Sequence, residues 1–324
     1  MRYCLIGPAG TSIPPTGWGA VESLIWDYYG ELKQRNQSVL ILNNEEGNMV
    51  HACNLFEPDV VYIMYDDYAY MSQHIHCSSI YLMTHFAYIT SPNLTTKFNW
   101  YYQNIFKQAI ACEKYLTLNA LSNEVADVYK EHGFRGKINV ISNGARSDLF
   151  CFTDTPKFSM RSIYIGKIED RKKQWVYQDL PNLFFAGNYQ DSSFDTSSPR
   201  YLGEWRKETL YADLTNYANL VLLSDGEADP LVVKEALMAG LGVVVSECAS
   251  ANLDNSRGFV TIIPNEKLHN MNYVSSQIEH NRKYSLENRA EIREYALSMF
   301  SWSVVVDKFL DVVNVDKQPK MNCE

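Results

Sequence analysis

The stretch that decides the fold is Leu222–Ala251, which reads LLSDGEADPLVVKEALMAGLGVVVSECASA. It begins with an apolar run, continues with turn-forming and acidic residues, and then stays free of helix breakers up to Gly240. We expect Asp229 to cap a helix whose first residue is Pro230, and Gly240 to end that helix. The apolar run 242–246 then predicts a second buried strand.

A helix that follows a parallel strand places its N-terminus at the carboxyl edge of the sheet, where backbone N–H groups and the helix dipole attract phosphate. Glu227 precedes the predicted helix, and Glu235 lies inside it, roughly 7–8 Å further along the axis at ~1.5 Å per residue. Carboxylates accept hydrogen bonds from sugar hydroxyls, so this arrangement fits a nucleotide sugar. It also fits a plain helix start, because the dipole favours an acid near the N-terminus.

The two glutamates have seven residues between them and are followed by Ala-Leu-Met-Ala-Gly and a valine-rich strand. This pattern resembles the E-x7-E motif of the retaining glycosyltransferases of family 4, which have the GT-B fold. The resemblance implies an α/β protein with two Rossmann-like domains facing across a cleft. It also implies that Glu227 contacts the donor hexose and Glu235 the ribose, so that affinity for a nucleoside diphosphate alone should not depend on Glu227.

The chain departs from that family just after the first glutamate. The family commonly has Gly-Phe-Gly there, whereas this chain has Ala228, Asp229 and Pro230. Pro230 has no N–H to donate, and Asp229 adds a negative charge beside the expected donor. The amides of Leu231 and Val232 remain for the phosphates.

Length and composition are typical of a globular protein with two domains. The chain has 324 residues, of which 46% are hydrophobic and 21% charged, and this length fits two domains of about 150 residues each. Its net charge of −9 and the lack of a large lysine and arginine cluster argue against a nucleic-acid partner.

The cysteine pattern indicates a reducing compartment. The seven cysteines are odd in number and scattered without a CxxC motif. No signal peptide is evident at the N-terminus, and no apolar stretch approaches about 18 residues. We therefore expect a cytoplasmic protein with at most peripheral membrane contact.

The N-terminal half alternates between short apolar runs and helix-period stretches, which predicts a parallel, doubly wound sheet. The expected strands are 3–6, 38–42, 59–65, 79–84, 114–118 and 137–141, and the expected helices are 20–34, 97–111 and 123–132. We assign residues 1–150 to this acceptor-side domain.

Two segments of this domain are similar to ligand-binding segments of the same glycosyltransferases. The loop after the first strand contains Gly17 and Gly19, which in the family approach the donor phosphate and sugar; the same glycines fit a plain tight turn. His85 follows the fourth strand, where the family often has a histidine near the reacting sugar and the acceptor. A histidine at a strand end is also explained by a structural role.

Other polar pairs in this half do not predict a metal site. His74 and His76 lack a partner acid or cysteine set and are expected at the surface. Asp66 and Asp67 follow a strand, but the chain contains no Asp-x-Asp, so we interpret them as solvated turn acids. We expect no metal ion and no cofactor.

The boundary between the two domains is expected near 143–158. Residues 141–150 end a strand in a turn and resemble the interdomain segment of the family, and a linker with Pro156 follows. We assign 151–300 to a nucleotide-sugar-binding domain. We expect the helical segment 301–324 to return to the first domain and end in a tail.

The second domain opens with a basic element after a glycine. Four cations, including Lys167, Arg171 and Lys172, lie within eight residues, starting directly after Gly166. The element resembles the "GR-(x)4-K" phosphate-binding motif of the family, with lysine at 167 in place of arginine. Lysine keeps the charge but loses the bidentate geometry, which Arg171 could supply. A basic helix start is the alternative interpretation.

A second resemblance in this domain concerns the nucleobase. Glu204 and Trp205 belong to a segment that is similar to the strand and turn beside the base in the family, where backbone groups usually bind it. The short strands expected before these residues are 183–186 and 200–202.

The sequence thus predicts a retaining glycosyltransferase with a nucleotide-sugar donor and a glycan, lipid-linked or protein-linked acceptor. Lys167, Lys172 and the amides after Pro230 would stabilise the leaving diphosphate, while Glu227 positions the sugar. Two alternatives remain open: a nucleotide-sugar 2-epimerase of the same fold, and a noncatalytic subunit that binds nucleotide sugar.

Overall fold

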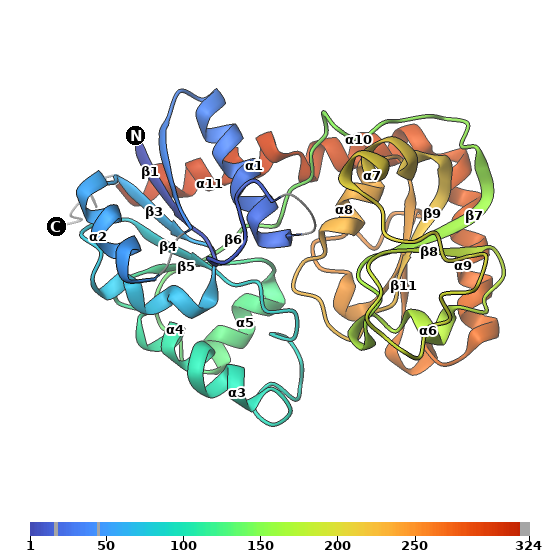
Figure 1. Cartoon of the computed structure of the whole chain (residues 1–324), viewed down its shortest axis with the longest axis horizontal. Helices are drawn as coiled ribbons and strands as arrows, with labels where there is room; N and C mark the ends of the chain where they lie inside the picture. The colour runs from blue at the N-terminus through green and yellow to red at the C-terminus, as the bar shows by residue number, and fades with distance from the viewer. Residues whose placement is uncertain (16–18, 44–45, 318–324) are drawn as a thin grey trace. The chain divides into compact units, whose positions relative to one another are not determined.

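The computed structural model describes residues 1–15, 19–43 and 46–317, which form two compact units (Figure 1). Unit 1 comprises Met1–Asn143 and the chain from Trp302, and unit 2 comprises Gly144–Ser301. Each unit contains one parallel sheet with helices in the connections between strands. The expected α/β class with two parallel-sheet domains is confirmed.

The sheet of unit 1 has six parallel strands in the order β2-β1-β3-β4-β5-β6. The inner strands are almost entirely buried, which explains why their sequences are continuous apolar runs. β3 pairs with β4, so the carboxyl ends of these two strands lie at the same sheet edge. The strands are β1 (Arg2–Ile6), β2 (Ser38–Leu42), β3 (Val60–Ile63), β4 (Ile80–Met83), β5 (Thr117–Ala120) and β6 (Ile138–Val140).

Helices and turns connect these strands, and the last helix of the chain packs on the first one. Phe309 of that last helix stacks on Tyr62 of β3, with ring centroids 4.7 Å apart, and so extends the core of unit 1. The helical segments are α1 (Ala20–Gln34), α2 (Glu46–Phe56), η1 (Asp66–Gln73), α3 (Asn99–Tyr101), η2 (Tyr102–Phe106), α4 (Lys107–Ala111), α5 (Asn123–Glu131) and α11 (Trp302–Lys317).

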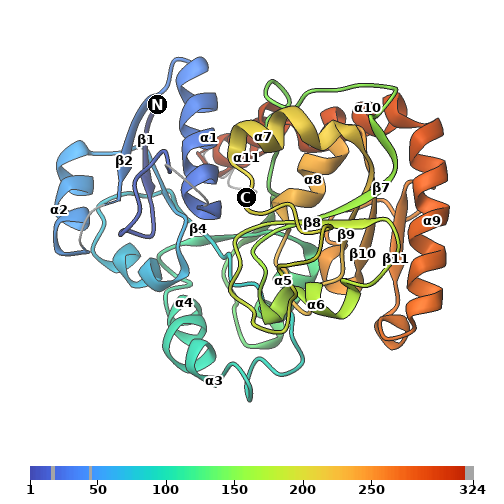
Figure 2. The same cartoon turned by 45° about the vertical axis from the view of Figure 1, so that its right-hand side comes forward.

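The sheet of unit 2 has five parallel strands in the order β11-β10-β9-β7-β8. Helix α9 packs along β7, β9, β10 and β11, as Figure 2 shows. The strands are β7 (Phe158–Ile165), β8 (Leu183–Ala186), β9 (Tyr217–Leu222), β10 (Gly242–Ser246) and β11 (Val260–Ile263). The helical segments are η3 (Asp170–Lys172), α6 (Gln174–Tyr177), α7 (Lys207–Asp213), η4 (Leu214–Asn216), α8 (Leu231–Met238), η5 (Glu247–Ala249), η6 (Asn265–Lys267), α9 (Met271–Glu287) and α10 (Arg289–Phe300).

A buried arginine at the start of α10 ties several parts of unit 2 together. Arg289 donates hydrogen bonds to the carbonyls of Thr153, Thr215, Tyr217 and Ala239 at 2.7, 2.6, 3.0 and 3.2 Å. Burial lowers its pKa to about 10, and the four carbonyls compensate the buried charge. These bonds join the first segment of unit 2 to the start of β9 and the end of α8.

Several expected elements differ from the observed ones. The segment 97–111 is divided among α3, a π-helical turn and α4, and the strand expected at 114–118 lies at Thr117–Ala120. Residues 200–202 form only a single bridge, between Tyr201 and Phe185. Helices α2 and α9 were not predicted, because polar residues interrupt their apolar pattern.

Candidate functional site

The turn between β9 and α8 has the predicted strand-turn-helix form, but the helix begins one residue later than expected. Leu231 is its first residue and Pro230, in extended conformation, is the N-cap. Gly240 ends the helix as expected, with φ +81° and a hydrogen bond from its N–H to the carbonyl of Leu237 at 3.0 Å.

Asp229 does not cap this helix, because its carboxylate turns inward. It forms a buried ion pair with Lys234, and it also accepts a hydrogen bond from Asn252 at 3.1 Å. Burial lowers the pKa of Lys234, whereas the charge of Asp229 acts to raise it. The negative charge expected beside the donor is therefore paired inside unit 2.

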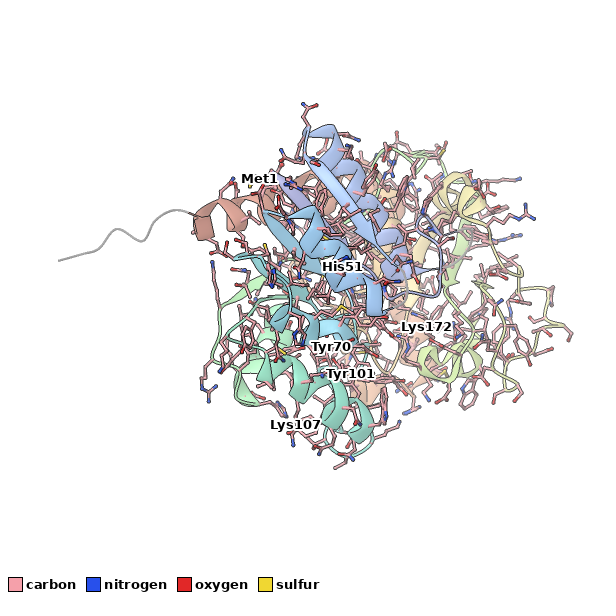
Figure 3. The ribbon with its side chains drawn as sticks, turned by 60° about the vertical axis from the view of Figure 1, so that its left-hand side comes forward. Met1, His51, Tyr70, Tyr101, Lys107 and Lys172 are labelled. Atoms are coloured by element: carbon pink, nitrogen blue, oxygen red, sulfur yellow. The ribbon has the colours of Figure 1, made fainter. Side chains whose placement is uncertain are left out.

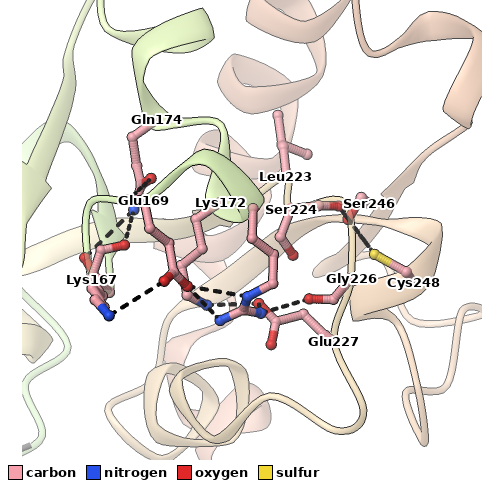
Figure 4. Close-up of polar contacts among 12 residues, drawn as sticks. Lys167, Glu169, Lys172, Gln174, Leu223, Ser224, Gly226, Glu227, Ser246 and Cys248 are labelled. Atoms are coloured by element: carbon pink, nitrogen blue, oxygen red, sulfur yellow. Dashed lines mark hydrogen bonds and ion pairs between the residues drawn. The ribbon is translucent and has the colours of Figure 1, made fainter. Parts of the chain in front are cut away.

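Glu227 lies at the centre of a cluster of charges (Figure 4). Its Oε1 atom is 2.6 Å from Lys172 Nζ and 3.0 Å from Arg171 Nη1. Burial acts to raise the pKa of Glu227, but the charges of Lys172 and Arg171 outweigh it and hold the pKa below its usual value. Glu227 is therefore an anion held by two cations.

Arg171 also fixes the loop that carries Glu227. It donates to the Gly226 carbonyl at 2.6 Å, and its own carbonyl accepts from the Asp225 N–H at 2.8 Å. On its other side the guanidinium pairs with Glu169 at 2.7 Å, and Glu169 lies 3.7 Å from Lys167. The basic element and the acidic loop thus form one continuous chain of charges.

The backbone places Lys172 beside Glu227. Tyr164, at the end of β7, donates from its hydroxyl to the Lys172 carbonyl at 2.5 Å and accepts from the Leu223 N–H at 2.9 Å. At Gly166 a Cβ atom would lie 3.0 Å from Cδ of Lys172, so the glycine leaves room for the lysine stem. At Gly187 a Cβ atom would lie 1.8 Å from the Gly166 carbonyl oxygen, so this position requires glycine.

The other predicted donor residues of unit 2 lie in varied surroundings. Glu235 is half-buried on α8, and Ala228 is buried in the turn before it. Glu204 is exposed and accepts a hydrogen bond from Asn188 at 3.0 Å. The ring of Trp205 is buried in the core against Tyr217, so only the backbone of this residue remains for a ligand. The half-buried Leu231 and Val232 are the first residues of α8.

In unit 1 the interpretation of Asp66 as a solvated turn acid is wrong. Asp66 is only 6% exposed and accepts hydrogen bonds from Thr84 Oγ1 and the Tyr101 hydroxyl, both at 2.8 Å. It also accepts from the His85 N–H at 3.2 Å. Burial raises the pKa of Asp66 to about 6, against the opposing effect of these bonds.

His85 is half-buried, and its ring has a buried nitrogen, Nε2. Within the described part of the chain its Nε2 has no hydrogen-bond partner. Burial lowers its pKa to about 4, so the imidazole is neutral at physiological pH. His74 and His76 are exposed, as predicted.

The glycine-rich loop is described only in part. Gly17 lies outside the described residues. Gly19 is the N-cap of α1, and a Cβ atom there would lie 2.7 Å from Oε2 of Glu22.

No group of three or more histidine, cysteine or acidic side chains that could hold a metal ion occurs among the described residues. Across residues 1–15, 19–43 and 46–317, no helix is both long and apolar enough to cross a membrane.

Similar proteins were found by comparison of structures but not by comparison of sequences. No protein-family model matches the sequence, and no curated protein matches it. Anabaena HepE in complex with UDP-glucose is similar over 97% of this chain and 100% of its own, with 15% identity and a TM-score of 0.70. Sucrose-phosphate synthase from Thermosynechococcus elongatus is similar over 97% and 98% of the two chains, with 12% identity and a TM-score of 0.76.

A third solved structure, the apo form of the lipopolysaccharide outer core galactosyltransferase WaaB, is similar over 98% of this chain and 100% of its own, with 13% identity and a TM-score of 0.68. The chain has the GT-B fold. At these identities the likeness shows the fold alone.

Sequence reasoning missed two features of this GT-B protein. Glu169 joins Lys167 to Arg171, and its place inside the basic element was the available signal. Asp66 was not predicted as a site residue, because the chain contains no Asp-x-Asp metal-binding motif. Its position at the end of one strand, with Thr84 and His85 at the end of the neighbouring strand, was the signal that could have revealed the cluster.

Proposed function

We propose that this protein is a glycosyltransferase that transfers a sugar from a nucleoside diphosphate sugar to a hydroxyl acceptor with retention of configuration. The observation that carries the proposal is the Glu227 cluster, in which an anion and two cations, Lys172 and Arg171, lie beside the start of α8 on a GT-B fold. The cations suit the diphosphate, and the carboxylate suits a sugar hydroxyl.

The proposed mechanism is mainly electrostatic. Lys172, Lys167 and the amides of Leu231 and Val232 stabilise the negative charge that develops on the leaving diphosphate. Glu227 orients the transferred sugar, and Glu235 binds the ribose. His85 lies near the reacting sugar. The leaving phosphate takes the proton of the acceptor, so the protein need not supply a base.

We propose that no metal ion takes part and that the protein acts in the cytoplasm on a glycan, lipid-linked or protein-linked acceptor. The support for metal independence is the pair of cations at the place where the diphosphate charge would be neutralised. Turnover is therefore expected to persist in excess EDTA. Loss of turnover in EDTA that manganese or magnesium restores would contradict this part of the proposal.

The proposed activity is tested by incubating the purified protein with a panel of nucleotide sugars. UDP-glucose is the first donor, because the similar Anabaena HepE was solved with UDP and with UDP-glucose. Release of nucleoside diphosphate, with transfer of the sugar to an added acceptor, is the expected result. Release of free 2-epimerised sugar without transfer would support the epimerase instead, and donor binding without any turnover would support a noncatalytic subunit.

A further inference from the structure

Asp66 collects three hydrogen bonds from segments that are far apart in the sequence. Thr84 and His85 follow β4, and Tyr101 is the last residue of α3, where Figure 3 labels it. The ring of Phe86, directly after His85, stacks on Tyr101 with centroids 3.6 Å apart. Asp66 therefore fixes the turn after β4 both directly and through Tyr101.

The bond from the His85 N–H is the one that sets the position of the histidine. The hydroxyls of Thr84 and Tyr101 can rotate and either donate or accept, but a backbone N–H can only donate. An ionised Asp66 makes all three bonds charge-assisted, and such bonds are roughly twice as strong as neutral ones. The His85 backbone is thus held most firmly when Asp66 carries its charge.

Within the described part of the chain, the buried Nε2 atom of His85 has no hydrogen-bond partner. Buried polar atoms are normally hydrogen-bonded, so an unsatisfied one needs an explanation, and a ligand hydroxyl is a suitable partner. The neutral imidazole offers one N–H donor and one acceptor nitrogen, and it can therefore bind a hydroxyl without adding charge.

We propose that Asp66 is a positioning residue that holds the turn after β4 so that the neutral His85 ring hydrogen-bonds a hydroxyl group of a bound sugar through Nε2. The role in turnover rests on the proposed glycosyltransferase activity. The Asp66–His85 link itself does not, and it can be measured in the free protein.

The titratable groups around Asp66 are few and come from separate elements. Asp67 lies beside it on η1, and its charge acts to raise the Asp66 pKa. His85, Tyr101 and Tyr129 face it from the turn after β4, from α3 and from α5, and Tyr65 directly precedes it in the chain. Burial keeps all four neutral at physiological pH, by lowering the pKa of His85 and raising the pKa of the three tyrosines. A titration near pH 6 at this place therefore reports Asp66.

The first test is NMR of the full chain labelled with ¹⁵N only at its seven histidines, with the His85 signal assigned by His85→Gln. The His85 amide signal is expected to titrate with a midpoint near pH 6 in the wild type and not to titrate in Asp66→Asn. In the matched control Asp67→Asn the titration should persist with a lower midpoint, because a repelling charge is removed. A His85 amide that does not titrate, or that titrates unchanged in Asp66→Asn, would overturn the proposal.

The second test is a double-mutant cycle on turnover. Asp66→Ala and His85→Ala are each expected to lower kcat at least 10-fold with little change in the KM for the donor. The double variant should be no slower than His85→Ala alone, because Asp66 acts through His85. Additive losses would overturn the positioning role. If the wild type turns over no donor, the proposed function fails, and the amide titration still decides whether Asp66 holds His85.

Discussion

Glu227→Gln tests the proposed donor site most directly. In the free protein the Glu227 carboxylate lies 2.6 Å from Lys172 Nζ and 3.0 Å from Arg171 Nη1. We propose that these same cations bind the diphosphate, so a bound diphosphate must compete with Glu227 for them. Glutamine keeps the shape of the side chain and removes its charge, which weakens the competitor.

The expected magnitude follows from the contact that the diphosphate must replace. A hydrogen bond to a charged group contributes about 1.5–3 kcal/mol, and 1.4 kcal/mol corresponds to a factor of ten in affinity. Glu227→Gln should therefore bind nucleoside diphosphate about tenfold more tightly or better, whereas turnover should fall by about 10², the scale for losing one positioned polar contact in the transition state. The E-x7-E resemblance alone predicts no change in diphosphate affinity, whereas the ion pairs of Glu227 predict tighter binding by the variant.

The assay is calorimetric titration of UDP, beside a thermal unfolding series with and without UDP. Glu227→Gln leaves Lys172 buried without its anion, so the variant should unfold at a lower temperature alone and gain more stability from UDP than the wild type does. Asp225→Asn is the control: it removes a charge from the same loop, but Asp225 pairs with Lys173 at 3.1 Å and does not contact Lys172. Equal or weaker UDP binding by Glu227→Gln would refute the competition.

Three further predictions concern the same unit. Lys172→Ala should weaken UDP binding by about 1.5–3 kcal/mol in calorimetry, with Lys173→Ala as a nearly silent neighbour; unchanged affinity would remove Lys172 from the site. Glu235→Ala should weaken binding of UDP and of UDP-glucose alike if it holds the ribose, and a loss confined to UDP-glucose would contradict that role. Lys234→Met should destabilise the fold by about 3–5 kcal/mol in denaturant unfolding, because it leaves Asp229 buried without a cation. Replacing both residues by apolar ones should recover much of that loss, and equal destabilisation by single and double variants would refute the buried pair.

The sequence predicted the architecture of the strands well because their buried runs are apolar and bounded by turn residues. β2, β8 and β10 have the expected bounds, and so does α1. Helix α2 was missed because polar residues interrupt its apolar pattern, and α9 because it carries polar residues on its buried side. Asn281 and Arg282 of α9, for example, are buried and hydrogen-bonded to β10 and β7, which no hydrophobic pattern reveals.

The candidate site was predicted in its residue types but not in its pairings. The spacing of Glu227 and Lys172 in the chain does not indicate that they form an ion pair, since that contact depends on how β7 and β9 pair in the sheet. Asp229 was expected to cap α8 and instead pairs with Lys234, because a buried charge is costly unless it is paired and Lys234 is buried beside it.

The buried carboxylates Glu227 and Asp66 are perturbed in opposite directions, and this contrast makes the pH dependence of turnover informative. Both are desolvated, but Glu227 faces two cations, which lower its pKa, whereas Asp66 faces only neutral donors, and its pKa is raised to about 6. Turnover should therefore fall as pH decreases through about 6, because protonated Asp66 holds the His85 backbone less firmly, while Glu227 remains charged. His85 titrates lower, with a pKa of about 4, and so does not account for that limb. The measurement is the pH profile of kcat from pH 5 to 8. The kcat of Asp66→Asn should be low and independent of pH across this range. If kcat of this variant still falls near pH 6, the titrating group is not Asp66.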